Sequence, residues 1–224
     1  MPLLEIACFT PSSALLAASA GADRIELCAN QHLGGTTPPS SWLPQIKATV
    51  QKVPIFIMIR PRGGDFFYSN VEFEEMKAQI RGFETLGADG FVFGMLKEDG
   101  CSVDVERTAE LVRLASPKPC TFHRAFDEVA DLMTGLEDVV STGCRSILSS
   151  GGRASAEEGV EGLGELVKKA DGRVTIIAGG GVRSGNIGSI RKVSGVRYLH
   201  SSAIVGGDSD SANVEEVKKM KSLL

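Results

Sequence analysis

The chain has few cysteines and few large aromatic side chains. Its 224 residues include five cysteines, one tryptophan and two tyrosines. The cysteines are odd in number and dispersed, and no pair of them has the spacing of a metal-binding finger. This usage excludes a small disulfide-rich secreted scaffold and predicts reduced thiols in a cytoplasmic protein.

The chain also lacks an excess of charge of one sign and a long apolar run. Its 24 basic and 28 acidic residues are interspersed and give a net charge of −4, so no basic face for nucleic acid is expected. No apolar run approaches the ~20 residues of a membrane-spanning helix. Met1–Thr10 have no basic start followed by an apolar stretch and a cleavage site. We therefore expect no secretory signal and neither a membrane nor nucleic acid as a partner.

Strand-like and helix-like segments alternate along the whole chain. The strand-like segments are Leu3–Cys8, Arg24–Cys28, Pro54–Arg60, Asp89–Met95, Pro119–His123, Arg145–Ser149, Val174–Ala178 and Val196–His200. Eight such units of about 25 residues predict parallel strands that close into a single-domain (β/α)8 TIM barrel over residues 1–205. Residues 206–224 form a C-terminal tail that we expect to be helical. A further helix is expected from about Glu128 to Ser141.

Side chains of a barrel strand point alternately into the barrel and towards the helices. Ile25 and Leu27 suit the helix layer, so Glu26 and Cys28 should point inward. The same parity sends Cys8 towards the helices. By this rule the inward side chains near the ends of other strands are Glu5, Ala7, Met58, Arg60 and His123.

Charged side chains thus gather where barrels of this kind bind ligands, at the C-terminal ends of the strands. Glu26, His123, Asp127 and Arg60 are the candidate catalytic residues, since carboxylate, imidazole and guanidinium groups support acid–base work on an anionic substrate. The same charges would also serve as a salt-bridge network that only fixes the barrel. No spacing of nucleophile and base selects one reaction.

A second signal is rich in glycine and serine and follows the last three strands. Loops at this place commonly form a phosphate site from backbone N–H groups, although glycines also serve simply to permit tight turns. The predicted anion-binding residues are Arg62, Arg124, Ser150, Gly151, Gly152, Gly179, Gly180, Gly181, Ser201 and Ser202.

A third signal concerns soft metal ligands. Cys28, Met58 and His123 are all predicted to point inward, and thiolate, thioether and imidazole groups suit Cu(I). Cys28 and Met58 are therefore the candidate metal ligands. The alternative is that both sulfur side chains merely fill the core, as inward cysteine and methionine usually do.

Several motifs together resemble the copper homeostasis protein CutC family, in order and at the family's spacing from about Leu4 to Ser202. They are Ala22–Cys28 (ADRIELC), Gly34–Pro38 (GGTTP), Met58–Phe66 (MIRPRGGDF), Thr121–Asp127 (TFHRAFD), Ser149–Gly152 (SSGG) and Gly179–Gly181 (GGG). The long motifs MIRPRGGDF and TFHRAFD make the resemblance specific.

The resemblance implies a cytoplasmic barrel that forms homo-oligomers and handles copper. It matches Cys28 to one copper-associated cysteine, whereas the other such position holds Ala7, with Cys8 one residue later. A shift of one residue reverses the facing direction of a strand side chain. Cys8 is therefore not expected to meet Cys28.

Three hypotheses follow. The first is a CutC-type copper homeostasis protein that binds Cu(I) weakly and needs no other cofactor. The second is a barrel enzyme acting on a small anionic or phosphorylated metabolite at the mouth, with Glu26 or His123 as the general acid–base. The third is an enzyme-shaped scaffold that works only through partner proteins.

Overall fold

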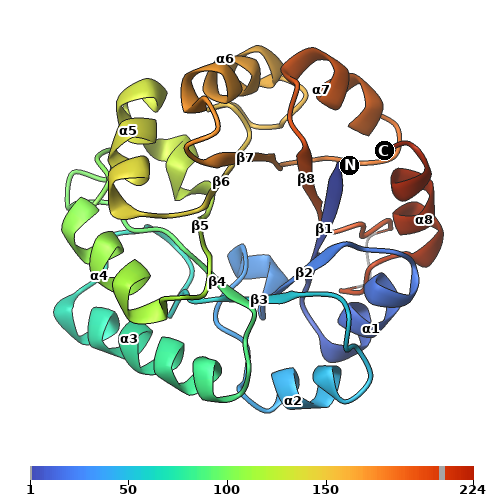
Figure 1. Cartoon of the computed structure of the whole chain (residues 1–224), viewed down its shortest axis with the longest axis horizontal. Helices are drawn as coiled ribbons and strands as arrows, with labels where there is room; N and C mark the ends of the chain where they lie inside the picture. The colour runs from blue at the N-terminus through green and yellow to red at the C-terminus, as the bar shows by residue number, and fades with distance from the viewer. Residues whose placement is uncertain (1, 207–209) are drawn as a thin grey trace.

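Eight parallel strands form a closed barrel in the computed structural model, which describes residues 2–206 and 210–224. Each strand pairs with its neighbours in chain order, and β8 pairs with β1. Figure 1 shows the strands as an inner ring surrounded by helices. The (β/α)8 barrel predicted from the sequence is confirmed. The strands are β1 (Leu3–Cys8), β2 (Arg24–Leu27), β3 (Ile55–Met58), β4 (Gly90–Phe93), β5 (Cys120–Phe122), β6 (Ser146–Ser149), β7 (Thr175–Ala178) and β8 (Tyr198–Ser201).

Helices cover the outside of the barrel, and one follows each strand in the described chain. The α-helices are α1 (Pro11–Ser19), α2 (Trp42–Lys47), α3 (Asn70–Thr85), α4 (Val105–Ala115), α5 (Leu132–Thr142), α6 (Val160–Ala170), α7 (Ile187–Ser194) and α8 (Val214–Ser222). Two short 3-10 helices, η1 (Gln31–Leu33) and η2 (Arg124–Glu128), lie in the loops after β2 and β5.

The helix expected from Glu128 begins later, at Leu132. Residues Arg124–Glu128 form η2, and the side chain of Asp131 accepts a hydrogen bond from the backbone N–H of Thr134. Such an N-cap satisfies a free donor of the first helical turn and fixes where the helix starts. Arg124 and Asp127 of the motif TFHRAFD therefore lie in the loop after β5 and not in α5.

Strand parity separates two apolar cores. The large one lies between strands and helices and contains Ile25, Leu27 and Cys8. The small one lies inside the barrel and consists of Cys28, Phe56, Met58 and Val92, with Phe9 packed against it. The prediction that Cys8 faces the helices while Cys28 faces inward is confirmed.

Helix α8 lies within the segment 206–224, of which residues 207–209 are outside the described part. Its Val217 and Met220 are fully buried, and Nζ of Lys221 lies 2.6 Å from Oδ2 of Asp23 in the loop before β2. These contacts hold the segment against the outside of the barrel beside α1. Among the described residues, no helix has both the length and the apolar character needed to cross a membrane.

Candidate functional site

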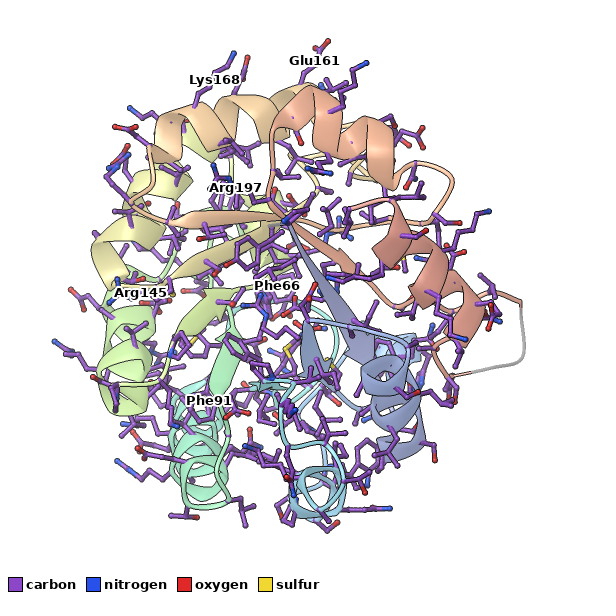
Figure 2. The ribbon with its side chains drawn as sticks, turned by 45° about the vertical axis from the view of Figure 1, so that its right-hand side comes forward. Phe66, Phe91, Arg145, Glu161, Lys168 and Arg197 are labelled. Atoms are coloured by element: carbon purple, nitrogen blue, oxygen red, sulfur yellow. The ribbon has the colours of Figure 1, made fainter. Side chains whose placement is uncertain are left out.

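A cavity of 120 Å³ lies inside the barrel at the C-terminal ends of the strands. In Figure 2, Phe66 lies near the centre of the ring, whereas Glu161 and Lys168 point outward from α6. The cavity brings together Glu26, Cys28, Met58, Arg60 and His123, which the sequence predicted to point inward. Its lining residues are Ala7, Phe9, Glu26, Cys28, Gly34, Met58, Arg60, Phe66, His123, Arg124, Leu148 and His200.

A chain of charged groups runs beneath this cavity from β2 to β8. Nε of Arg24 donates to Oε2 of Glu5 at 2.5 Å, and Nδ1 of His200 lies 2.7 Å from Oε1 of the same carboxylate. Nε2 of His200 lies 3.9 Å from Oε2 of Glu26, which accepts from Sγ of Cys28 at 3.4 Å. The guanidinium of Arg24 also lies over the ring of Phe56, 4.3 Å from its centroid. Each charge is thereby placed next to a partner of opposite sign or a ring face.

The pKa values of Glu5, Glu26 and His200 follow from burial and neighbouring charge. Burial alone would raise the pKa of Glu5, but Arg24 and His200 outweigh it and lower that pKa to about 2. Burial raises the pKa of Glu26, and although His200 lowers it, the result is a raised pKa to which Glu5 also contributes. Burial would lower the pKa of His200, yet the nearby carboxylates of Glu26 and Glu5 raise it. Glu5 is thus held ionised beside His200, while Glu26 is the carboxyl group that most readily accepts a proton.

His123, which directly follows β5, also lines the cavity and is 4% exposed. Its Nδ1 accepts a hydrogen bond from the backbone N–H of Ala125 at 3.1 Å. Burial and then the charge of Arg60 lower its pKa to about 3, so the ring is neutral and carries its proton on Nε2. Within the described residues, Nε2 has no hydrogen-bond partner. The ring packs against Phe66, with centroids 4.9 Å apart.

Gly94 makes room for the His123 ring. A Cβ added at Gly94 would lie 2.5 Å from Nδ1 of His123, which is closer than real Cβ contacts allow. The backbone directly after β4 can therefore approach the imidazole only because position 94 has no side chain.

Arg60 connects the loops that follow β2 and β3. Its terminal nitrogens donate to the carbonyl oxygens of Leu33, Gly35 and Gly64 at 3.0, 3.2 and 2.8 Å. Its guanidinium lies over the ring of Phe66, 4.7 Å from the centroid. Nε is buried without a partner in the described chain. Arg60 thus shapes the roof of the cavity and contributes positive charge to it.

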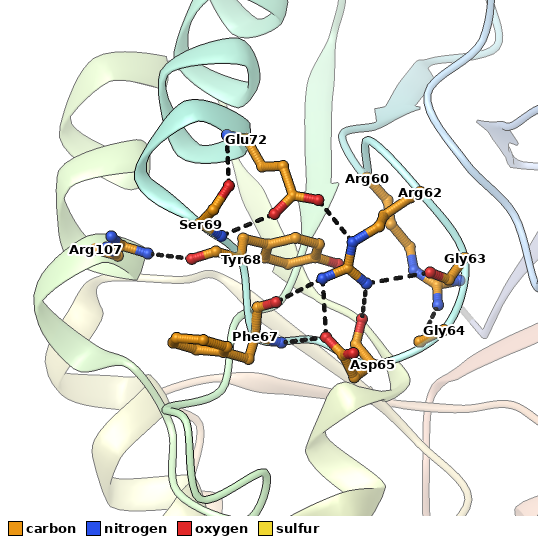
Figure 3. A network of polar contacts seen from close by, with 10 residues as sticks. All are labelled: Arg60, Arg62, Gly63, Gly64, Asp65, Phe67, Tyr68, Ser69, Glu72 and Arg107. Carbon is orange, nitrogen blue, oxygen red and sulfur yellow. Dashed lines mark hydrogen bonds and ion pairs between the residues drawn. The ribbon is translucent and has the colours of Figure 1, made fainter.

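Arg62 lies outside the cavity, in the network that Figure 3 shows. It donates to Oε1 of Glu72 at 2.6 Å, to Oδ1 of Asp65 at 3.0 Å and to the carbonyl oxygen of Phe67 at 2.7 Å. Glu72 also forms the capping box of α3 with Ser69. Arg62 therefore ties the loop after β3 to the start of α3, and the structure does not bring it into the cavity with Arg60.

The carboxylate of Asp127 accepts hydrogen bonds from the loop after β6. It accepts from Oγ of Ser149 at 2.6 Å, from the backbone N–H of Ser150 at 3.0 Å and from that of Gly152 at 3.2 Å. Nε of Arg124 also donates to it at 2.8 Å. The sequence predicted that the Ser150–Gly152 segment binds an anion. In this structure the anion is a side chain of the same protein.

The loops after β7 and β8 are joined through Arg183. It donates to Oγ of Ser201 at 2.9 Å and to Oγ of Ser202 at 3.3 Å. Gly180 lies beside Arg124, since a Cβ added there would be 3.4 Å from the Cζ atom. Gly179–Gly181 therefore adjoin the mouth, whereas the two serines serve a contact within the protein.

The interior cavity continues into an outer cleft of 790 Å³. Four residues line both spaces: Gly34, Arg60, Phe66 and Arg124. Arg153 adds a third guanidinium to the cleft, and Asp127, Glu128 and Glu158 add carboxylates. Two arginines, Arg60 and Arg124, therefore belong to both the interior cavity and the outer cleft.

A larger hollow of 860 Å³ lies elsewhere, along the loop after β2 and the helices α2 and α3. Trp42, Phe83 and Leu86 are among its lining residues. None of the buried charged groups described above line it, so it is a weaker candidate for a catalytic or metal site in spite of its size. We place the candidate site in the smaller interior cavity, where buried carboxylate, imidazole and guanidinium groups converge.

The described residues include one group whose geometry could hold a metal ion and one pair of soft candidate ligands. One oxygen each of Glu5 and Glu26 and one nitrogen of His200 lie within 4.8 Å of one another. In that group, Glu5 already forms an ion pair with Arg24. The second set is soft: Cys28 and Met58 belong to one apolar cluster and line the same cavity.

His200 and Arg24 are the members of this site that the sequence reasoning missed. The signal was available, because Leu199 lies in the helix layer and its neighbour His200 must then face inward. The sequence grouped His200 with the serines that follow it. The same parity rule that places Glu26 and Cys28 in the barrel also places Arg24 there.

Comparison with known proteins gives one consistent result. The model of the CutC family matches residues 2–205. The chain belongs to the CutC family. A human relative, named copper homeostasis protein cutC homolog, is 45% identical over 92% of this chain and 75% of its own length. A family protein CutC from Chromobacterium violaceum is 44% identical over 90% of this chain and 81% of its own.

A solved structure agrees with the family. The putative copper homeostasis protein CutC from Streptococcus agalactiae superposes with a TM-score of 0.85 at 29% identity, covering 90% of this chain and 99% of that one. The family and the fold predicted from the motifs are therefore confirmed.

Proposed function

We propose that this CutC family member acts in copper homeostasis, the role after which its relatives are named, by binding one Cu(I) ion weakly in the interior cavity. The observation that supports this most directly is that Cys28 and Met58 line the same buried space. A thiolate and a thioether are the donors that Cu(I) prefers over harder cations.

The surroundings of Cys28 make this a weak site. Burial raises the pKa of the Cys28 thiol well above its usual value, and the carboxylate of Glu26 raises it further. Cu(I) must displace the thiol proton, and that cost reduces its apparent affinity. Cys8 cannot provide a second thiolate, because its side chain lies in the core between strands and helices.

A competition titration tests the proposal. Reduced protein is titrated with Cu(I) against a colorimetric Cu(I) chelator, and Cys28→Ala and Met58→Leu are compared with the control Cys101→Ala. Cys101 is half-buried and is not among the residues that line the cavity. We expect at least a tenfold loss of affinity for Cys28→Ala, a smaller loss for Met58→Leu and none for the control. Equal binding by wild type and Cys28→Ala would exclude this site.

A second function is proposed for the same cavity: acid–base catalysis on a small anionic or phosphorylated metabolite. It is favoured by one observation that copper binding leaves unexplained. Oε1 of Glu26 and Nε2 of His123 are both buried and have no partner among the described residues, and both residues line the cavity. Buried polar atoms are normally satisfied, so two unpartnered atoms on residues that line one cavity favour a polar ligand.

The structure revises which residues would hold the anion. Arg62 lines neither the cavity nor the cleft, so Arg60 and Arg124, which line both, take that role in this proposal. Soaking crystals with phosphate and with a small carboxylate tests this. Density beside Arg60 and Arg124 is expected. Anions bound only at the outer surface would contradict the proposed catalytic function of the cavity.

Residence in the cytoplasm and self-association remain predictions from the resemblance. Size-exclusion chromatography with light scattering would test the homo-oligomer directly.

A further inference from the structure

The imidazole of His123 is held in one orientation and can donate a hydrogen bond from Nε2. Because Nδ1 accepts from the backbone N–H of Ala125, the neutral ring must carry its proton on Nε2. Gly94 and Phe66 hold the ring on both sides. A buried donor left unpaired costs about 1–3 kcal/mol, which an acceptor atom of a ligand would recover.

Glu26 presents the complementary group from β2. Its Oε2 accepts from Cys28, while Oε1 has no partner among the described residues. The carboxyl group is 3% exposed and lines the same cavity as His123. One wall therefore offers a neutral N–H donor and another offers a carboxylate oxygen.

The size and charge of the space restrict what lies between these two groups. A volume of 120 Å³ has room for roughly four water-sized groups, given the ~30 Å³ that one water takes in the liquid. Arg60 and Arg124 stand at the opening towards the outer cleft. The ligand class that matches is a small compound with a polar acceptor inside and an anionic group near the arginines.

We propose that this cavity enolises a small carbonyl compound that carries one carboxylate or phosphate group, a proposal that rests on the second function above. The carbonyl oxygen accepts the hydrogen bond from Nε2 of His123. A neutral, positioned imidazole is well suited to polarise a carbonyl group without protonating it. Arg60 and Arg124 hold the anionic group, which sets the carbonyl between His123 and Glu26.

The step needs no oxidant or other co-reactant. A carboxylate oxygen of Glu26 takes the proton from the carbon next to the carbonyl, and the electron pair of that C–H bond becomes the C=C bond. The π pair of the carbonyl moves onto its oxygen, where the His123 N–H stabilises the negative charge. Return of the proton to the same carbon exchanges it with solvent. When the neighbouring carbon bears a hydroxyl group, return of the proton to the former carbonyl carbon isomerises the compound, since the hydroxyl proton moves to the former carbonyl oxygen and the hydroxyl oxygen becomes the new carbonyl.

His200 acts here as a positioning residue. Its Nε2 lies 3.9 Å from Oε2 of Glu26, and its Nδ1 is held by Glu5. Burial would lower the pKa of His200, but Glu26 and Glu5 raise it, which favours the charged ring next to the Glu26 carboxylate.

Hydrogen exchange in D2O tests the proposal on the full chain. Pyruvate and glycerone phosphate serve as the carboxylate and phosphate probes, and the loss of their carbon-bound protons is followed by NMR. We expect at least tenfold faster exchange than in buffer for one probe, which identifies the anion. Glu26→Gln and His123→Gln should each lose at least tenfold of that rate. The exposed variant Glu161→Gln should retain it, as Glu161 lies on the outside of α6.

Binding is measured in the same samples by saturation-transfer NMR, so that two failures are told apart. Binding of a probe without exchange would overturn enolisation and leave anion binding standing. If a probe shows no binding and no exchange, both enolisation and anion binding are overturned. If Glu26→Gln does not fold, oxalate, which resembles the enolate of pyruvate, gives a second measurement on the wild type. It should suppress the exchange of pyruvate, and exchange unaffected by saturating oxalate would contradict the proposal.

Discussion

Nδ1 of His200 lies 2.7 Å from Oε1 of Glu5, and this contact joins the last strand of the barrel to the first. Glu5 is also held by Arg24 from the second strand. Three adjacent strands are thus linked by buried charges at the point where the barrel closes. These links fix the orientation of His200 and through it the surroundings of Glu26.

Glu5→Gln should destabilise the fold in a pH-dependent way. Glu5 has a pKa of about 2 in the folded protein against an ordinary 4.5, so its contribution is complete above pH 4.5 and is lost as the pH falls through 2. We expect the variant to lose about 3–5 kcal/mol at pH 7, as for a broken buried ion pair. Urea unfolding of both proteins between pH 7 and pH 3 should show this difference shrinking below pH 4.5.

The control for that experiment is Glu215→Gln. The Glu215 side chain is 82% exposed and pairs only with Lys218 among the described residues. It should cost less than about 1 kcal/mol at any pH. A cost of Glu5→Gln that does not change between pH 7 and pH 3 would refute the assignment of its ionised state.

Asp127→Asn should loosen the loop after β6. The carboxylate serves Ser149, Ser150 and Gly152 at once, and an amide cannot accept from all of them and from Arg124. We expect a loss of about 2–3 kcal/mol in chemical denaturation and faster amide exchange at Ser150 and Gly152. Asp138→Asn on α5 is the matched control. Unchanged exchange at both amides would show that Asp127 does not hold the loop.

Gly94→Ala should displace the His123 ring. The added methyl group would fall 2.5 Å from Nδ1, and the strain is expected to cost about 1–3 kcal/mol. The control is Gly188→Ala on α7, where an added Cβ meets nothing within 4 Å, so no destabilisation is expected. Thermal unfolding and the NMR shifts of the His123 ring measure both effects. Equal stability of the two variants would contradict the packing described for His123.

Thiol labelling should be selective among the cysteines. Burial raises the pKa of Cys8 and of Cys144 to about 12 each, and raises that of Cys28 well above its usual value. Cys101 is only half-buried. A maleimide at pH 8 should therefore modify Cys101 first, because the thiolate is the reactive form. Mass spectrometry of digested protein checks the order, and early modification of Cys28 would be inconsistent with its buried position.

The sequence predicts the parts of this molecule that depend on local pattern. Alternation and strand parity are enough to predict the barrel and to place Glu26 and Cys28 inside it while Cys8 faces the helices. Pattern cannot show which donors and acceptors are already used within the protein. The cradle at Ser150–Gly152 has the composition of an anion site, and only the fold shows that Asp127 fills it.

Partners far apart in the chain are likewise invisible to the sequence. His200 and Glu5 are separated by 195 positions, so their contact exists only once the barrel closes. Arg62 and Arg60 are neighbours in one motif, yet one faces the start of α3 and the other faces the cavity. Their different directions follow from the irregular loop after β3, where strand parity no longer applies.

The central claim is that one interior cavity receives the ligands of this protein, and the methyl NMR signal of Met58 tests it most directly. Met58 lines the cavity, whereas Met76 and Met220 are fully buried in the helix layer. Protein labelled at its methionine methyl groups is titrated with chelator-buffered Cu(I) and, separately, with pyruvate and glycerone phosphate. The account predicts that Cu(I) and at least one of the two anions shift the Met58 signal and leave those of Met76 and Met220 in place. A Met58 signal that moves with none of them would contradict it.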